Sequence, residues 1–166
     1  MVIKIGYFAQ VKKMRHYMIP ISTAMWPPKW FTGKNPNGVY LGLSHYNLVP
    51  GPRCHNLCCG PKTCGQQTEN CAFLRGYYKQ LQETNFNRLI EDLETIAIAV
   101  KKDAGFPEEP VIVLMVYETP DNPCSERTIL RKWFEDHGRQ LEDLKIEDRP
   151  LMQNLTKELK KNFTRA

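Results

Sequence analysis

The chain has 166 residues, of which 42% are hydrophobic and 25% are charged, a composition typical of a globular domain that can bury a core. It contains no apolar run near the roughly 20 residues of a membrane-spanning helix, so we expect no membrane partner. Its first residues lack the basic and small-residue features of a signal peptide. We therefore expect a cytoplasmic protein whose thiols stay reduced.

Positive charge is concentrated in the first part of the chain. The net charge is +5, but residues 1–68 hold eight Lys or Arg and no Asp or Glu. Residues 69–166 hold fifteen basic and eighteen acidic side chains. A long segment without acidic residues favours a surface for phosphate groups, as in nucleotides and nucleic acids. The alternative is that these charges are spread thinly over solvated loops.

The first predicted elements are two short strands. Residues 2–8 form a short apolar run, and residues 17–23 form a second one after a basic turn or short helix. Pro20 interrupts the second run and cannot donate a ladder hydrogen bond, which indicates a strand at the edge of the sheet or a bulge.

A long irregular insertion, residues 24–72, follows the second strand. It is rich in proline and glycine, with a possible short strand at residues 39–43. Loops of this length are uncommon in compact domains and are usually functional. The insertion has few apolar side chains that could form a core. We therefore expect a metal centre to stabilise its structure.

The second half of the chain alternates helices and strands. Helical periodicity covers residues 73–103 with a break near 83–85, and residues 125–137 predict another helix. Residues 111–117 read as a central parallel strand, 141–146 as a last strand, and an amphipathic helix follows Pro150. The pattern predicts one α/β domain over residues 1–166. Its mostly parallel sheet would have about four to five strands flanked by helices, with the metal-stabilised insertion after the second strand.

Five of the six cysteines fall within eighteen residues of the insertion. They are Cys54, Cys58, Cys59, Cys64 and Cys71. Spacings of three and four residues suit zinc, and clustered cytosolic cysteines indicate a metal site. We expect four of the five to be ligands, with one of the adjacent pair left out and His55 as an alternative ligand. Zn²⁺ is the expected metal, and a [4Fe–4S] cluster is the alternative.

Three residues after the central strand could carry chemistry. Glu118 ends the strand, Cys124 precedes the next helix, and Arg127 lies one turn into it. A helix N-terminus stabilises a thiolate, so Cys124 could be a nucleophile with Arg127 holding an anion. The alternative is structural: Cys124 packs as a small hydrophobe, and Arg127 pairs with a neighbouring carboxylate.

A second group of candidate residues lies at and after the end of the second strand. In parallel sheets ligands bind beyond the carboxyl ends of the strands, which selects Ser22 and Thr23. An aromatic and basic stretch follows. Its candidate ligand-binding residues are Trp26, Lys29, Trp30 and Lys34. Aromatic side chains beside cations can stack bases while neutralising phosphates. Alternatively, Trp26, Trp30 and Phe31 form a small core beneath the insertion.

Several short motifs resemble the domain of unknown function 488 family of small bacterial, archaeal and phage proteins. Lys4-Ile5-Gly6 is similar to the family's opening strand. Residues 77–100 are similar to its aromatic helix, and residues 113–118 to the strand that follows that helix. Residues 124–127 are similar to its Cys-His-Arg element. The resemblance covers about half the chain, mainly residues 73–138. It implies an α/β fold with a cleft near Glu118.

The chain departs from that family at two motifs. Ile21-Ser22-Thr23 stands where the family has Asp-Val-Arg, and Cys124-Ser125-Glu126-Arg127 stands where it has Cys-His-Arg. An activity that relies on that Asp or His is not expected here, and the resemblance says little about the reaction.

Three functions are compatible with these patterns. The leading hypothesis is a metal-binding protein that binds or processes nucleic acid or a nucleotide. The second is a small-molecule enzyme that uses Cys124 and Glu118. The third is a protein-interaction module with a structural zinc knuckle. The sequence gives no indication of oligomeric state.

Overall fold

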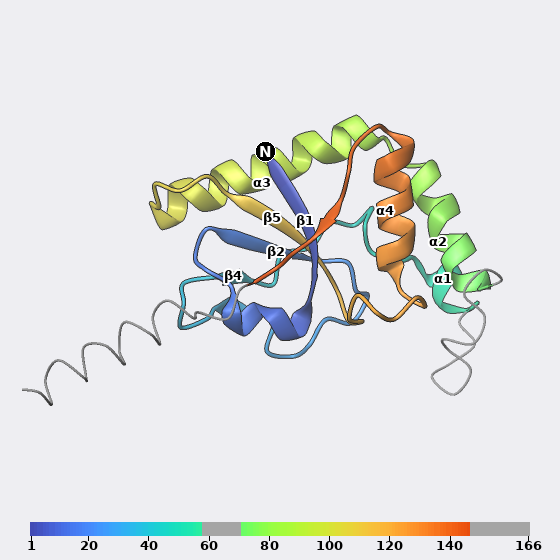
Figure 1. The fold of residues 1–166 in the computed structure, drawn as a ribbon, viewed down its shortest axis with the longest axis horizontal. Coiled ribbons are helices and arrows are strands. Elements are labelled where there is room, and N and C mark those ends of the chain that lie inside the picture. The colour runs from blue at the N-terminus through green and yellow to red at the C-terminus, as the bar shows by residue number, and fades with distance from the viewer. Residues whose placement is uncertain (58–70, 147–166) are drawn as a thin grey trace, which may run out of the picture.

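The computed structural model describes residues 1–57 and 71–146. A four-stranded sheet with the order β2-β5-β1-β6 runs through them (Figure 1), and every pairing in it is parallel. The strands are β1 (Val2–Tyr7), β2 (Met18–Ser22), β5 (Val111–Val116) and β6 (Glu142–Asp143). The predicted α/β fold with a mostly parallel sheet is therefore confirmed. β5 is an inner strand as predicted, and β2, which contains Pro20, lies at the sheet edge.

Helices surround this sheet. They are the 3₁₀ helix η1 (Phe8–Lys13), α1 (Pro52–His55), α2 (Ala72–Gln82), α3 (Phe86–Ala104) and α4 (Glu126–Asp136). A hairpin of β3 (Gly33–Lys34) and β4 (Tyr40–Leu41) lies within the insertion. Figure 1 shows α2 and α4 side by side. Among the described residues, no helix is long and apolar enough to cross a membrane.

The structure confirms the predicted break between α2 and α3, and Asn85 caps α3 there. The Asn85 side chain accepts a hydrogen bond from the Arg88 backbone N–H at 3.1 Å, which satisfies one orphan donor at the start of α3. Gly105 ends α3 with a φ of 72°, a left-handed conformation that glycine adopts without strain.

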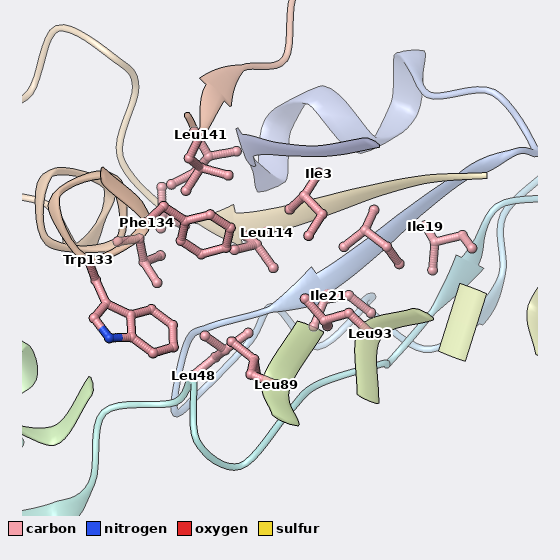
Figure 2. Packing of buried hydrophobic residues seen from close by; sticks show 14 of the residues in the cluster. Ile3, Ile19, Ile21, Leu48, Leu89, Leu93, Leu114, Trp133, Phe134 and Leu141 are labelled. Carbon is pink, nitrogen blue, oxygen red and sulfur yellow. The ribbon is translucent and has the colours of Figure 1, made fainter. Parts of the chain in front are cut away.

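One face of the sheet packs against α2, α3 and α4. Side chains alternate along β5, so Ile112 and Leu114 point toward the helices. Figure 2 shows this layer. Its labelled members are Ile3, Ile19, Ile21, Leu48, Leu89, Leu93, Leu114, Trp133, Phe134 and Leu141.

The other face of the sheet packs against η1 and the insertion. Val113 and Met115 of β5 meet Phe8 and Val11 from η1. From the insertion, Phe31 and Val39 join the same cluster and Leu48 joins the helix-side core, all three buried. Hydrophobic burial therefore orders the first half of the insertion, where the sequence led us to expect a metal to supply the core. The predicted metal-stabilised part, with residues 58–70, lies outside the described residues, as does the helix predicted after Pro150.

Candidate functional site

The carboxyl ends of the four parallel strands meet at one edge of the sheet. Ser22 ends β2 and Glu118 follows β5, so the structure places these predicted ligand residues at this edge. Ser22 and Thr23 are both buried. The Thr23 hydroxyl donates to the Met115 carbonyl at 2.8 Å. Thr23 therefore ties β2 to β5, whereas Ser22 lines a cavity.

A cavity of about 430 Å³ lies beyond the end of β2. Ser22, Met25, Pro27, Ser44, Tyr46 and Pro50 are among the residues that line it. This volume lies within the usual range for small-ligand sites. None of its lining residues carries a formal charge. The cavity therefore suits a neutral group with an apolar face.

Four exposed aromatic side chains surround this end of the sheet, and we call them the aromatic surface. They are Trp26, Trp30, Tyr46 and Tyr117, with exposed fractions of 69%, 51%, 80% and 52%. The Tyr117 hydroxyl donates to the Trp26 carbonyl. The buried Phe8 ring contacts both Tyr117 and Trp30, with centroids 4.7 and 6.4 Å away. Exposed rings on a fixed support suit stacking against a ligand.

The structure separates the two interpretations of the aromatic stretch. Phe31 is buried and belongs to the core, as the small-core alternative has it. Trp26 and Trp30 are exposed, which leaves their faces accessible.

Two cations of the insertion lie close to the aromatic residues in sequence. Lys29 and Lys34 are both exposed, and the Lys34 ammonium lies 4.6 Å from the centre of the Tyr40 ring. Residues 1–57 contain seven Lys or Arg and no Asp or Glu. The Tyr40 hydroxyl donates to Asp103 near the end of α3, so Lys34 lies near a carboxylate there. Lys29 directly precedes Trp30 of the aromatic surface.

A histidine–aspartate pair fixes the loop that carries Tyr46. His45 Nε2 lies 2.9 Å from Asp92 Oδ2 on α3, and the Asn47 N–H donates to His45 Nδ1 at 3.2 Å. The hydrogen bond from His45 lowers the pKa of Asp92. The Tyr46 ring stacks on the His45 ring at 4.8 Å. Sequence reasoning left His45 isolated because its partner is 47 residues away.

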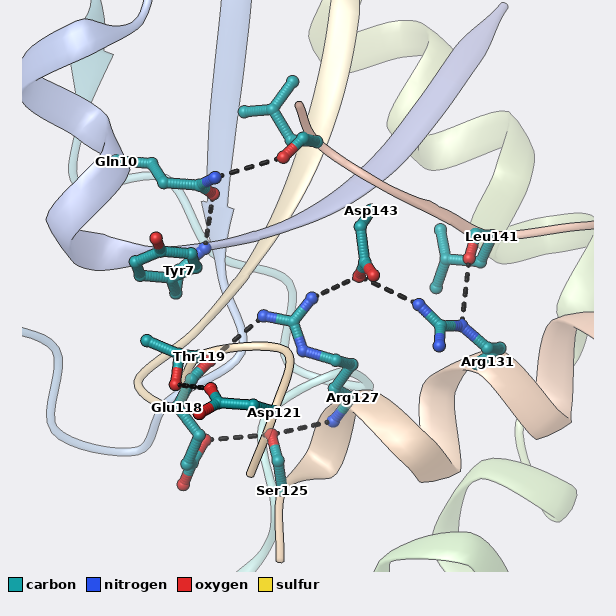
Figure 3. Close-up of polar contacts among 11 residues, drawn as sticks. Tyr7, Gln10, Glu118, Thr119, Asp121, Ser125, Arg127, Arg131, Leu141 and Asp143 are labelled. Atoms are coloured by element: carbon teal, nitrogen blue, oxygen red, sulfur yellow. Dashed lines mark hydrogen bonds and ion pairs between the residues drawn. The ribbon is translucent and has the colours of Figure 1, made fainter. Parts of the chain in front are cut away.

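Glu118 and Arg127 belong to one polar network between β5, β6 and α4 (Figure 3). The Ser125 hydroxyl donates to Glu118 Oε2 at 2.9 Å and accepts from the Arg127 N–H at 3.2 Å, so it caps α4. Arg127 donates through Nη2 to the Glu118 carbonyl at 3.0 Å and through Nη1 to Asp143. Arg131 also donates to Asp143, at 2.8 Å.

This network gives Arg127 a structural role. Its side chain is 3% exposed, and its two terminal nitrogens bond to protein acceptors. Its Nε has no hydrogen-bond partner among the described residues, but the burial of the side chain leaves an anionic ligand little access to it. The structural alternative had Arg127 pair with Glu118 or Glu126. The structure instead pairs it with the Asp143 carboxylate and the Glu118 backbone.

Cys124 lies one residue before the Ser125 cap and is 7% exposed. Its backbone N–H donates to Asn122 Oδ1 at 3.0 Å. Burial restricts the access of a substrate to the thiol. The packing alternative from the sequence fits this position better than the nucleophile hypothesis does.

Glu126 is a titratable residue that sequence reasoning missed. It begins α4 and is half-buried. Burial raises the pKa of its carboxyl to about 7, and the negative charge of Glu118 adds to this rise. Two neighbouring carboxyl groups in different protonation states can serve as an acid and a base. An acidic residue at the start of a predicted helix is visible in the sequence. The burial that raises the pKa of Glu126 depends on the packing of α4 and is not.

We expect Glu126→Gln to weaken the pH dependence of stability. Between the ordinary pKa of 4.5 and about 7, the folded state binds more protons than the unfolded state. The free energy of unfolding should therefore fall as pH rises through this window. The amide should reduce this fall between pH 5 and pH 8 by up to about 3 kcal/mol in urea titrations. The exposed Glu94→Gln variant is the control, and equal pH profiles for wild type and Glu126→Gln would refute the assignment.

Two of the five clustered cysteines lie in the described part of the chain. Cys54 is 4% exposed in α1, its sulfur lies 3.7 Å from Gln80 Oε1, and burial raises the pKa of its thiol. Cys71 directly precedes α2. Cys58, Cys59 and Cys64 lie outside the described residues.

The sequence predicts His55 as an alternative metal ligand. Its ring packs between Trp26 and Phe73, with centroid distances of 4.8 and 5.5 Å. Its Nε2 is buried and has no hydrogen-bond partner in the part of the chain that the structure describes. Among residues 1–57 and 71–146, no three His, Cys, Asp or Glu residues form a group that could hold a metal ion.

No protein-family model, curated protein or solved structure matches this chain. Its function must therefore be argued from the geometry of the described residues.

Proposed function

We propose that the protein binds single-stranded nucleic acid, or a nucleotide, on the aromatic surface. The observation that carries this proposal is the exposure of Trp26, Trp30, Tyr46 and Tyr117 around the carboxyl ends of β2 and β5. Every base has an aromatic face, so exposed rings can bind a strand with little dependence on sequence. A soluble domain has no structural need to leave two tryptophans half or more exposed at its ligand-binding edge.

Charge supports the same class of ligand. Lys29, which directly precedes Trp30, would neutralise a phosphate beside the stacked bases, and Lys34 would contact the strand only farther along the insertion. The cavity beyond Ser22 is open to an uncharged ring, and Tyr46 lines it. Together these features combine stacking faces, a neutral cavity and a cation near the carboxyl ends of β2 and β5.

Salt dependence tests this proposal. We expect the protein to bind a fluorescently labelled 15-residue oligothymidylate in an anisotropy titration. The logarithm of the affinity should fall with the logarithm of salt concentration, by about 0.7 for each phosphate contacted. A duplex of the same length should bind more weakly because its bases are already stacked. A Lys102→Gln variant, on the far end of α3, should behave as wild type, and an absence of salt-dependent binding would contradict the proposal.

The metal remains a separate part of the proposal. We propose that the cysteine cluster of residues 54–71 holds Zn²⁺, with a [4Fe–4S] cluster as the alternative, in a reducing cytoplasm. The thiol content and spacing support this, with four of the five cysteines as ligands, Cys58 or Cys59 left out, and His55 as an alternative ligand. Metal analysis with an absorption spectrum, on protein purified without oxygen, distinguishes the two metals: a broad band near roughly 400 nm indicates iron and sulfur.

A second candidate function is an enzyme that acts at the end of β5. The specific observation is the pKa of Glu126, which burial and then the charge of Glu118 raise to about 7. This arrangement favours acid–base chemistry over the thiol chemistry expected for Cys124. The proposed kinship with the domain of unknown function 488 family would be compatible with it, because the resemblance also points to a cleft near Glu118.

A further inference from the structure

A second cavity lies between η1 and the β3–β4 hairpin, with Trp30 in its lining. We call it the η1 pocket, and its volume is about 470 Å³. Its apolar lining comes from Phe8, Val11, Trp30 and Leu41, and its polar lining from Lys12 and Asn37. Sequence reasoning treated Lys12 as part of a basic turn and did not connect it with Trp30, eighteen residues away.

The apolar wall of the η1 pocket is held by the core. Phe8 and Val11 are 4% and 2% exposed. The Trp30 ring meets both Phe8 and Phe31 edge-on, with centroids 6.4 and 6.2 Å away. These contacts fix the edge of the indole while half of the side chain stays exposed. A flat apolar group could therefore lie against Trp30 with little rearrangement.

The polar wall of the pocket is also preformed. Asn35 Oδ1 accepts hydrogen bonds from the backbone N–H groups of Asn37 and Val39, both at 3.0 Å. The Asn37 side chain donates to the carbonyls of Lys12 and Met14 at 3.1 and 3.4 Å. The hairpin turn is thereby tied to η1.

The charge of the pocket selects its ligand. Lys12 is exposed at the C-terminal end of η1, and no lining residue is acidic. A purely apolar ligand would make no ion pair with Lys12, and a small inorganic anion would not stack on the indole of Trp30. A flat ring joined to an anionic group uses both.

We propose that the η1 pocket binds a nucleoside 5′-monophosphate unit, with its base against Trp30 and its phosphate at Lys12. The unit could be a free nucleotide or the 5′ end of a strand. The choice of a nucleotide as the ligand rests on the proposed function. The existence of the pocket and its positive charge are independent of that proposal. The η1 pocket would then hold one terminal unit, and Trp26, Tyr46 and Tyr117 would hold the bases that follow.

Tryptophan fluorescence can test this pocket separately from the rest of the aromatic surface. Trp133 is 1% exposed, so in a Trp26→Phe protein the accessible signal comes from Trp30. We expect adenosine 5′-monophosphate or a 5′-phosphorylated six-residue oligothymidylate to quench this signal. Ala9 is exposed and lines the pocket, so Ala9→Phe should fill it and weaken binding at least about tenfold. Ala9→Ser is the matched control and should bind as its parent does.

The charge variant guards against a folding artefact. Lys12→Gln alters an exposed side chain and should weaken binding of either probe without changing thermal stability. If Ala9→Phe weakens the quench by adenosine 5′-monophosphate, the ligand is a free nucleotide. If it weakens the quench by the oligothymidylate, the ligand is the 5′ end of a strand. If neither probe gives a quench that Ala9→Phe weakens, the proposal is overturned.

Failure of this proposal and failure of the proposed function give different results. In a Trp30→Phe protein, quenching of Trp26 by the oligothymidylate shows that the aromatic surface binds a strand even if the η1 pocket is empty. Conversely, a quench of Trp30 that Ala9→Phe removes establishes the pocket even if no long strand binds.

Discussion

Replacement of Arg127 by leucine should lower the free energy of unfolding by about 3–5 kcal/mol. Arg127 is buried, and it joins the Asp143 carboxylate of β6 to the backbone carbonyl of Glu118 after β5. Leucine would leave both acceptors without this donor in a partly buried environment. Urea titration at neutral pH would measure the loss.

Arg131 provides the matched control for this experiment. It donates to the same Asp143 carboxylate, but its side chain is 39% exposed. Arg131→Leu should cost no more than about 1 kcal/mol, as expected for a surface ion pair. Equal losses for the two variants, or a loss below 1 kcal/mol for Arg127→Leu, would show that Arg127 is not the tie between β5, β6 and α4.

Trp26→Ala should weaken binding of single-stranded oligothymidylate by about 1–3 kcal/mol, or roughly 5- to 150-fold. Trp26 is 69% exposed, and its backbone carbonyl, which accepts from Tyr117, is retained in the variant. The loss should therefore come from stacking and leave the fold intact. Anisotropy titrations at fixed salt would measure it.

The salt dependence separates stacking from charge. Trp26→Ala should leave the slope of affinity against salt unchanged, whereas Lys29→Gln should reduce the slope by about 0.7 if it contacts one phosphate. Ile98→Ala removes an equally exposed apolar side chain from α3 and should change neither quantity. An equal loss for Ile98→Ala and Trp26→Ala would mean that the aromatic surface has no special role.

Local patterns in the sequence were enough to predict most of the fold. The apolar runs at residues 2–8, 17–23 and 111–117 contain the parallel strands β1, β2 and β5, because strands covered on both faces need nearly continuous hydrophobicity. Pro20 predicted an edge strand because it lacks a ladder donor. The last predicted strand is reduced to Glu142–Asp143, and the leucines on either side of it, Leu141 and Leu144, are buried.

The parts of the site that the sequence did not predict depend on contacts between distant residues. Asp143 is sixteen residues from Arg127, and no local period relates the two. The raised pKa of Glu126 follows from burial and from the nearby Glu118, which only the packing of α4 against the sheet end brings together. The η1 pocket likewise needs the insertion to fold back over η1.

Quenching of intrinsic fluorescence by oligothymidylate tests the aromatic surface most directly. The chain has three tryptophans, of which Trp26 and Trp30 are exposed and Trp133 is buried. We predict that a saturating oligothymidylate quenches the wild-type protein and leaves a Trp26→Phe/Trp30→Phe protein, which retains Trp133, almost unchanged. No quenching of the wild type, or equal quenching of both proteins, would contradict the account.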